Sequence, residues 1–253
     1  MHGRAITFDF HNTLASCPEW FELEVRTLPS AFLGWWSDHH QGRLGAETGR
    51  EADRLYQGLR RDIMEHGNEL SAEACLKQIF SQMRLDVPES DIETGVALLM
   101  RRALAGASPI PGAVETVREL HQSGTAIGIV SSAVYHPFLE WTLDAFGVLG
   151  AFQVVITSAS AGFYKSRPEI FLHAAHALGG NPSRMVHIGD SLRFDVGGAS
   201  RVGMGTVWLR REGRRHTEDG FAPDLTLDSL VSAAPKIMEV LDARPADSDR
   251  PRV

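Results

Sequence analysis

The stretch Ala5-Ile6-Thr7-Phe8-Asp9-Phe10, followed by His11-Asn12-Thr13-Leu14, stands near the start of the chain. It is a short apolar run rich in β-formers and is bounded by a turn-like polar segment, so it predicts a buried strand. Asp9 then falls at the carboxyl end of that strand. In open parallel sheets this is the end where ligands bind.

Beyond residue 112 the pattern alternates between helical and strand segments. This alternation predicts an α/β fold with a doubly wound parallel sheet of the Rossmann-like type. The expected helices cover residues 113–121, 138–146, 168–178, 195–202 and 230–241, and the expected strands cover residues 126–130, 154–157, 185–188 and 206–209.

Between the first strand and this alternation, about residues 18–104 have apolar side chains at helical spacing and few β-branched runs. They predict an inserted all-helical domain. We therefore expect a core of residues 1–15 and 106–242, a helical insert of residues 16–105, and a disordered tail of residues 243–253 that is rich in Pro, Asp and Arg. The apolar positions are Leu55, Leu59, Ile63, Leu76, Ile79, Phe80 and Met83.

The amino-acid composition limits the kinds of partner and the cellular compartment that we expect. The 253-residue chain has a formal net charge of -7, which gives no basic field for a nucleic-acid backbone. Its two cysteines, Cys17 and Cys75, have no metal-site spacing and predict free thiols in a reducing compartment. No apolar run is long enough for export or for a membrane span. We expect a cytoplasmic protein without nucleic-acid or membrane partners, either a monomer or a homodimer.

Four polar residues follow four predicted strands or lie in the loops between them: Asp9, Ser131, Lys165 and Asp190. Each alone is compatible with a turn former or a helix cap. The carboxyl ends of parallel strands meet at one edge of a sheet, so together these side chains predict a shared site at that edge.

In these segments the chain resembles the haloacid dehalogenase superfamily, whose signature is D-x-D-x-T, then Ser or Thr, then Lys, then an acidic Gly-Asp motif. The matching segments are Asp9-Phe10-His11-Asn12-Thr13, Ser131, Lys165-Ser166-Arg167-Pro168, and Gly189-Asp190 with Asp195. The resemblance implies a phosphatase-like member, and it makes the helical insert a cap of the family's first type.

A carboxylate can displace a phosphoryl group and form an aspartyl-phosphate, which divides one difficult hydrolysis into two steps. Both reactants are anionic, so a divalent cation and a fixed ammonium are needed. The resemblance makes Asp9 the nucleophile, Lys165 the ammonium, and Ser131 a donor to the phosphate. It implies that Asp9, Asp190 and the backbone carbonyl of His11 hold Mg²⁺, which prefers oxygen ligands. Thr13 is grouped with the catalytic residues, because it is expected to stabilise the turn after Asp9 and to touch the phosphoryl site. Supporting roles are expected for Ser132, Gly189, Ser191 and Asp195.

The chain departs from the family's phosphatases two residues after the nucleophile, where His11 replaces the usual aspartate and Asn12 replaces glycine. That aspartate protonates the leaving oxygen and activates water. A histidine, with an ordinary pKa of about 6.5, suits the same proton transfer. Alternatively His11 supplies only its carbonyl to the metal, or activity is lost.

Other functions of this fold stay open at this stage. Haloacid dehalogenases usually carry tyrosine at the position of His11 and lack the metal-binding carboxylate that Asp190 supplies, so Asp190 argues against dehalogenation. Phosphonate-cleaving members need a cap lysine, for which Lys77 is the candidate, although its pattern favours a surface charge. A phosphotransferase and a catalytically weak protein that binds a phosphorylated metabolite are the further alternatives.

The early cap concentrates aromatic residues, and Trp20, Trp35 and Trp36 are candidates for substrate contact, although packing between the cap helices is the favoured explanation for most of them. The spacing of the cap arginines favours a solvated face over a second anion site. These are Arg43, Arg50, Arg54, Arg60 and Arg61. The expected substrate is a small phosphorylated metabolite.

Overall fold

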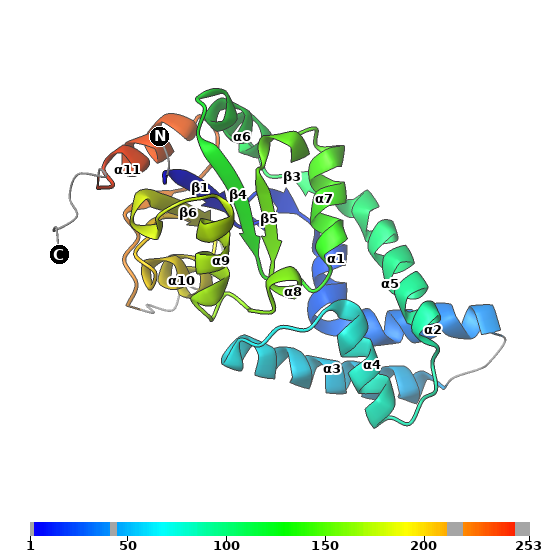
Figure 1. The fold of residues 1–253 in the computed structure, drawn as a ribbon. Coiled ribbons are helices and arrows are strands. Elements are labelled where there is room, and N and C mark those ends of the chain that lie inside the picture. Colours follow the sequence, from blue (N-terminus) through cyan, green and yellow to red (C-terminus); the bar gives the residue numbers. More distant parts are fainter. Residues whose placement is uncertain (1–2, 41–44, 212–219, 246–253) are drawn as a thin grey trace.

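The computed structural model describes residues 3–40, 45–211 and 220–245. Its main sheet has six parallel strands in the order β5, β4, β1, β6, β7, β8, which confirms the predicted doubly wound α/β class (Figure 1). The central strand β1 pairs with β4 on one side and β6 on the other. The strands are β1 (Ala5–Phe8), β4 (Ala126–Ser131), β5 (Val154–Thr157), β6 (Met185–Gly189), β7 (Gly205–Leu209) and β8 (Leu225–Leu227).

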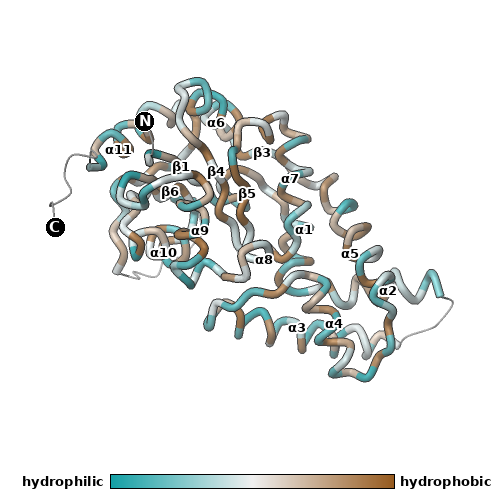
Figure 2. The backbone as a smooth tube through the Cα atoms, in the orientation of Figure 1, coloured by the Kyte–Doolittle hydropathy of each residue, from teal (hydrophilic) through white to brown (hydrophobic). Residues whose placement is uncertain are grey.

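Helices cover both faces of this sheet, and alternate strand residues point to opposite faces. Ile6 and Phe8 pack with α6 (Ala113–Gln122), α7 (His136–Ala145) and α11 (Ala234–Asp242). Ala5 and Val130 pack with α9 (Glu169–Ala177) and α10 (Gly197–Ser200). Both faces of the strands are therefore apolar, and Figure 2 shows the strands at the centre in brown. A parallel sheet buried on both faces has this pattern.

The segment between β1 and β4 is helical and stands to one side of the sheet (Figure 1). Its helices are α1 (Pro18–Glu22), a π-helical turn (Leu23–Thr27), α2 (Leu28–His40), α3 (Ala46–His66), α4 (Ala72–Gln82) and α5 (Glu89–Ala103). The chain enters and leaves this cap through β2 (Ala15–Ser16) and β3 (Ser108–Pro109), which pair antiparallel. The division at residues 16 and 105 stays a prediction.

Trp35 and Trp36 of α2 pack against other helices of the cap. A Cβ at Gly95 of α5 would lie 2.5 Å from Phe32 and 2.6 Å from Trp35 of α2, so only glycine lets these helices approach this closely. Trp35 is 9% exposed, and its ring lies 5.5 Å from that of Phe32. The Trp36 indole donates a hydrogen bond to Asp91 at 3.0 Å. Both tryptophans therefore bind α2 to the rest of the cap.

Several elements differ from the sequence prediction. Strands β2, β3 and β8 were not predicted, because each has two or three residues and no resolvable period. The last helix begins at Ala234 and not at Leu230, since Ser232 has a left-handed φ of 55° and the Leu230 carbonyl accepts a hydrogen bond from Thr116. The helix expected at residues 195–202 is divided into a π-helical turn (Leu192–Val196) and α10.

Short helical elements complete the described chain. They are α8 (Ser158–Ala161) and the 3-10 turns Leu104–Gly106, Leu149–Ala151 and Pro182–Arg184. Cys17 and Cys75 are buried and free, as predicted. Residues 246–253 of the predicted tail lie outside the described residues.

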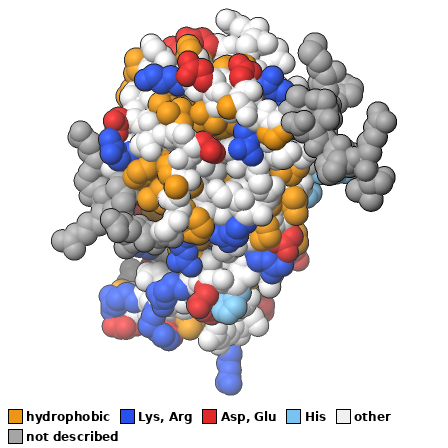
Figure 3. Space-filling model, turned by 90° about the vertical axis from the view of Figure 1, so that its left-hand side faces the viewer, with side chains coloured by type: hydrophobic (Ala, Val, Ile, Leu, Met, Phe, Trp, Pro, Cys, Tyr) orange, Lys and Arg blue, Asp and Glu red, His pale blue; other side chains and the backbone are white. Residues whose placement is uncertain are grey.

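Two features of the structure concern possible membrane and nucleic-acid partners. No helix in the described ranges is long and apolar enough to cross a membrane. On the face in Figure 3, acidic and basic side chains are interspersed without a field of one sign. The cytoplasmic location and the lack of nucleic-acid partners stay predictions.

Candidate active site

Asp9 follows β1 directly and is held by a tight turn. Its backbone N–H donates to the Ile188 carbonyl of β6 at 2.8 Å, which continues the strand pairing to this residue. The chain then reverses through Asn12, whose φ of 65° is left-handed, a conformation that asparagine tolerates better than most residues. Within the turn, Thr13 donates its hydroxyl to Asp9 Oδ2 at 3.1 Å. The carboxylate is thereby oriented, and Asp9 is 7% exposed.

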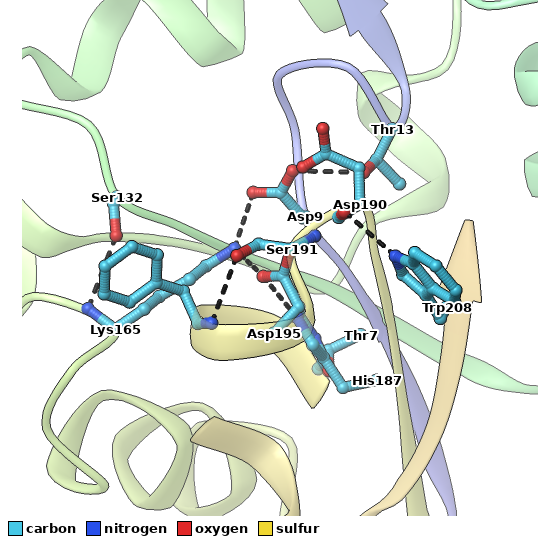
Figure 4. Close-up of polar contacts among 11 residues, drawn as sticks. Thr7, Asp9, Thr13, Ser132, Lys165, His187, Asp190, Ser191, Asp195 and Trp208 are labelled. Atoms are coloured by element: carbon cyan, nitrogen blue, oxygen red, sulfur yellow. Dashed lines mark hydrogen bonds and ion pairs between the residues drawn. The ribbon is translucent and has the colours of Figure 1, made fainter. Parts of the chain in front are cut away.

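Lys165 bridges two carboxylates. Its Nζ lies 2.5 Å from Asp9 Oδ1 and 2.6 Å from Asp195 Oδ1, and the residue is 2% exposed (Figure 4). Its backbone N–H donates to the Ser132 hydroxyl at 3.3 Å, which joins this loop to the end of β4. Burial alone would lower the pKa of Lys165, but Asp195 and Asp9 outweigh it and raise the pKa above its ordinary value. Lys165 is therefore a fixed ammonium.

Asp195 is held by further donors. The Ser191 N–H donates to its Oδ2 at 2.8 Å, and His187 Nε2 lies 3.2 Å from its Oδ1. Burial alone would raise the pKa of Asp195, but Lys165 and His187 hold it below its usual range. Because this carboxylate only accepts, Nε2 of His187 carries the proton, and the Thr7 hydroxyl donates to Nδ1 at 2.9 Å. A hydrogen-bonded chain thus runs from Thr7 to Lys165.

The sequence analysis did not identify Thr7 and His187. They lie inside strands and face each other in the register of β1 and β6. His187 is 1% exposed, and burial lowers its pKa. The available signal was two polar residues inside otherwise apolar strands, since a buried polar group needs a partner.

Asp190 completes an acidic group. One carboxylate oxygen each from Asp9, Asp190 and Asp195 can be chosen so that all lie within 4.8 Å of one another. The Asp190 carbonyl accepts a hydrogen bond from the Trp208 indole at 3.1 Å. Burial raises the pKa of Asp9, Lys165 acts against this, and the Asp195 charge adds to it. Three carboxylates against one ammonium form a donor set that fits a hard divalent cation such as Mg²⁺.

A pocket of about 260 Å³ opens onto this cluster. It brings together most of the predicted site residues, and Thr13 lies fully buried behind Asp9. Gly189 lies below Asp195, where a Cβ would be 2.2 Å from the carboxyl carbon, so the position requires glycine. The predicted residues that line the pocket are Asp9, His11, Trp20, Ser131, Ser132, Lys165, Asp190, Ser191 and Asp195.

The structure separates the three tryptophans proposed for substrate contact. Trp20 lines the pocket and is 1% exposed. Trp35 and Trp36 lie outside it, in the helix contacts of the cap described above. Lys77, the alternative cap nucleophile, is exposed on α4 and forms an ion pair with Glu89. Its place at the surface matches the surface charge that the pattern favoured.

His11 meets the cap. Its ring stacks on Phe21 with centroids 4.6 Å apart and planes 13° apart, and it lies edge-on to Trp20 at 5.6 Å. Phe21 and Trp20 belong to α1, the first helix of the cap. The residue that departs most from the family's phosphatases is therefore fixed by aromatic contacts and still lines the pocket.

The cap also carries a buried ion pair. Arg60 of α3 is 4% exposed and pairs with Glu69, so the prediction of a solvated face was wrong for this arginine. Helical spacing does not show which face meets the core. The neighbouring loop bonds to the core, since Glu69 N–H donates to the Gly162 carbonyl at 3.0 Å and Tyr164 N–H to that of Gly67 at 2.9 Å. The cap thus contacts the loop that carries Lys165.

The chain thus combines a parallel α/β core, an inserted helical cap and a buried carboxylate–lysine cluster at the strand ends. The chain belongs to the haloacid dehalogenase-like hydrolases, because that family's model matches residues 4–203. This confirms the resemblance found in the sequence.

Individual relatives agree with this assignment. The chain is 28% identical over 229 residues to a glyceraldehyde 3-phosphate phosphatase of Methanopyrus kandleri, covering 89% of this chain and 93% of that protein. It is 30% identical over 125 residues to a pyrimidine 5'-nucleotidase of Escherichia coli, covering 49% of this chain and 54% of that protein.

Solved structures share the fold. A phosphatase of the family from Thermococcus onnurineus superimposes with a TM-score of 0.61 at 24% identity, covering 93% of this chain and 97% of that one. A 2-haloacid dehalogenase from Pseudomonas syringae has a TM-score of 0.66 at 17% identity, with 94% and 98% covered. Since phosphatases and dehalogenases match equally well, fold alone does not select the reaction.

Proposed function

We propose that this protein is a magnesium-dependent phosphatase that hydrolyses a small phosphate monoester by transferring the phosphoryl group to Asp9. The observation that carries the proposal is the position of the Asp9 carboxylate directly after the central strand. Lys165 Nζ lies 2.5 Å from Asp9 Oδ1, and Asp190 belongs to the same acidic group. The relatives named as phosphatases support an ester substrate. The carboxylate of Asp190 supports a metal-dependent reaction over dehalogenation.

In the proposed first step an Asp9 oxygen attacks phosphorus, and the bond from phosphorus to the ester oxygen breaks. The Lys165 ammonium offsets the negative charge, and the Ser131 hydroxyl donates to a phosphoryl oxygen. Asp9, Asp190 and the His11 carbonyl would hold magnesium, which would offset the repulsion between the carboxylate and the phosphate. Water then hydrolyses the aspartyl-phosphate, which restores Asp9 and releases inorganic phosphate.

We assign the proton transfer to His11. A protonated imidazole gives its proton to the leaving oxygen in the first step, and the neutral ring accepts one from water in the second. Its place in the pocket wall supports this role. The stacking on Phe21 limits its rotation.

The test is phosphate release from a panel of monoesters with magnesium, for wild type, Asp9→Asn and the exposed control Asp144→Asn. Asp9→Asn keeps the shape of the site and removes the nucleophile, so turnover falls by about 10³-fold or more. The control and wild type turn over alike, and chelation of magnesium stops both. Unchanged turnover in Asp9→Asn rules out the covalent mechanism.

A second candidate is a protein that binds a phosphorylated metabolite without efficient turnover. The replacement of the usual aspartate by His11 favours it. If wild type releases no phosphate from any ester, yet one ester with magnesium raises its melting temperature, this candidate replaces the phosphatase.

A further inference from the structure

The wall of the pocket that faces away from the acidic cluster is aromatic and apolar. Trp20 and Phe21 of α1, Val25 of the following π-helical turn, and Met64 of α3 come from the cap. The core adds Tyr164 and Phe194, whose rings meet edge to face with centroids 5.3 Å apart. With the phosphoryl group at Asp9, the leaving group of the ester would contact this wall.

Charge is confined to the other wall. Among the residues that line the pocket, the charged ones are Asp9, Lys165, Asp190 and Asp195, all of them members of the core cluster. No arginine or lysine of the described part of the cap lines the pocket. The residues that line the wall around the leaving group therefore include no cation, and Arg193, which lies 5.1 Å from the Phe194 ring, is exposed and outside the lining.

Two arginines that lie beside pocket residues, Arg60 next to Tyr164 and Arg211 next to Asn12, already donate to oxygen acceptors. Both terminal nitrogens of Arg60 donate to the Glu69 carboxylate, whose side chain is 0% exposed. Arg211, which follows β7, donates from Nη1 to the backbone carbonyl and side-chain oxygen of Asn12 at 3.0 and 3.1 Å. Neither arginine lines the pocket.

We propose that the pocket selects esters whose leaving group is small and carries no charge, and that it rejects esters whose leaving group carries a carboxylate. The inference rests on the proposed function and specifies the substrate class of the same site. A carboxylate here would lie against apolar rings with no cation among the residues that line this wall, which disfavours it relative to an uncharged group. The volume of about 260 Å³ favours a small ester.

A hydroxyl or carbonyl group, in contrast, would find hydrogen-bonding partners. The His11 imidazole and the Asn12 amide both line the pocket, and Arg211 fixes the Asn12 oxygen. A short polyhydroxy or aldehyde leaving group therefore satisfies both the polar and the apolar part of the wall.

The first experiment compares glyceraldehyde 3-phosphate with 3-phosphoglycerate, which differ by an aldehyde against a carboxylate at the same carbon. Rates are measured with magnesium at about pH 7, where an ordinary histidine is present in both protonation forms. We expect kcat/KM to be higher for the aldehyde by about tenfold or more, chiefly through KM. Equal values, or a preference for the carboxylate, would overturn the inference.

The second experiment adds a positive charge to the pocket wall and measures whether the preference between the two esters changes. Met64→Lys places an ammonium in the half-buried wall position, and Gln78→Lys adds the same charge on the exposed face of α4. Met64→Lys should move the ratio of the two kcat/KM values toward the carboxylate by about tenfold, while Gln78→Lys keeps the wild-type ratio. An equal ratio in both variants contradicts the proposed wall.

Binding separates this inference from the phosphatase proposal. If wild type hydrolyses no ester of the panel, the phosphatase proposal fails, and calorimetric titration of both esters with magnesium still tests the charge preference. Tighter binding of the aldehyde supports the uncharged subsite. Equal or tighter binding of the carboxylate refutes it, whatever the turnover.

Discussion

Two buried charge clusters lie close together in this molecule and differ in how their charge is balanced. In the core, Lys165 faces the carboxylates of Asp9 and Asp195, with Asp190 in the same group. At the junction with the cap, Arg60 pairs with Glu69, and the Ser158 hydroxyl donates to the same carboxylate at 2.7 Å. Both clusters are shielded from solvent, but only the core cluster opens into the pocket.

The charges of the cap cluster balance one another. Arg60 and Glu69 form one pair, and the nearby Glu24 is 2% exposed, so burial raises its pKa well above the ordinary value and favours the neutral carboxyl. The core cluster has more carboxylates than cations. A balanced buried pair stabilises one arrangement of the chain, whereas an unbalanced cluster in a pocket marks a place where a ligand completes the charge. We therefore assign a structural role to the cap cluster and a chemical role to the core cluster.

The largest expected effects come from removing each cation. Lys165→Met and Arg60→Met each leave a buried carboxylate without its partner and should lower the free energy of unfolding by about 3–5 kcal/mol. Lys165→Met also abolishes turnover, and magnesium restores part of its stability because the metal replaces the missing positive charge. Chemical unfolding with and without magnesium measures both variants.

Arg60→Met is the matched control for the role of the metal. It should keep substantial turnover under conditions where it is folded, and magnesium should stabilise it no more than wild type. If magnesium rescues both variants equally, or if Arg60→Met loses turnover as completely as Lys165→Met, the two clusters do not differ in the way described.

A smaller effect is expected at His11, where the cap touches the core cluster. His11→Ala should slow the hydrolysis of alkyl phosphates by about 10²-fold, because their leaving oxygen needs a proton, and should affect aryl phosphates little. His11→Asp should retain or raise alkyl ester hydrolysis. Steady-state rates for both ester types decide the matter, and an equal loss for the two types would assign His11 a geometric role.

The smallest effect concerns pH and the cap cluster. Since the folded state raises the pKa of Glu24, the unfolded chain loses this proton first, and wild type loses stability as pH rises above the ordinary glutamate value of about 4.3. Glu24→Gln removes that loss. Its stability relative to wild type should therefore increase with pH until the folded-state pKa is passed.

Urea unfolding at a series of pH values measures this difference. Glu65→Gln changes an exposed glutamate of α3 and serves as the control. A difference between Glu24→Gln and wild type that stays constant with pH would show that Glu24 is ionised in the folded cap.

The sequence predicted the core site better than the cap for a physical reason. Asp9, Ser131 and Asp190 end or directly follow strands, and parallel strands bring such residues to one edge whatever the details of packing. The position of Arg60 depends on which face of α3 meets the core, and helical spacing does not contain that information. Thr7 and His187 depend on the register of two distant strands, which only the folded sheet sets.

The cap tryptophans illustrate the same limit. Composition singled out Trp20, Trp35 and Trp36 together, but the three lie on two helices with different surroundings. Trp20 is on α1, which begins two residues after β2 and lies against His11. Trp35 and Trp36 are on α2 and pack within the cap. The position along the chain relative to β2 therefore distinguishes Trp20 from Trp35 and Trp36, whereas amino-acid composition does not.

The most direct test of the account is to trap the covalent intermediate. Wild type is mixed with a phosphorus-labelled ester and magnesium, quenched in acid, digested, and analysed for a phosphoryl group on the peptide that carries Asp9. The account predicts label on Asp9, its release by hydroxylamine as expected for an acyl phosphate, and no label in Asp9→Asn. Phosphate release by wild type without label on Asp9, or label that persists in Asp9→Asn, would contradict it.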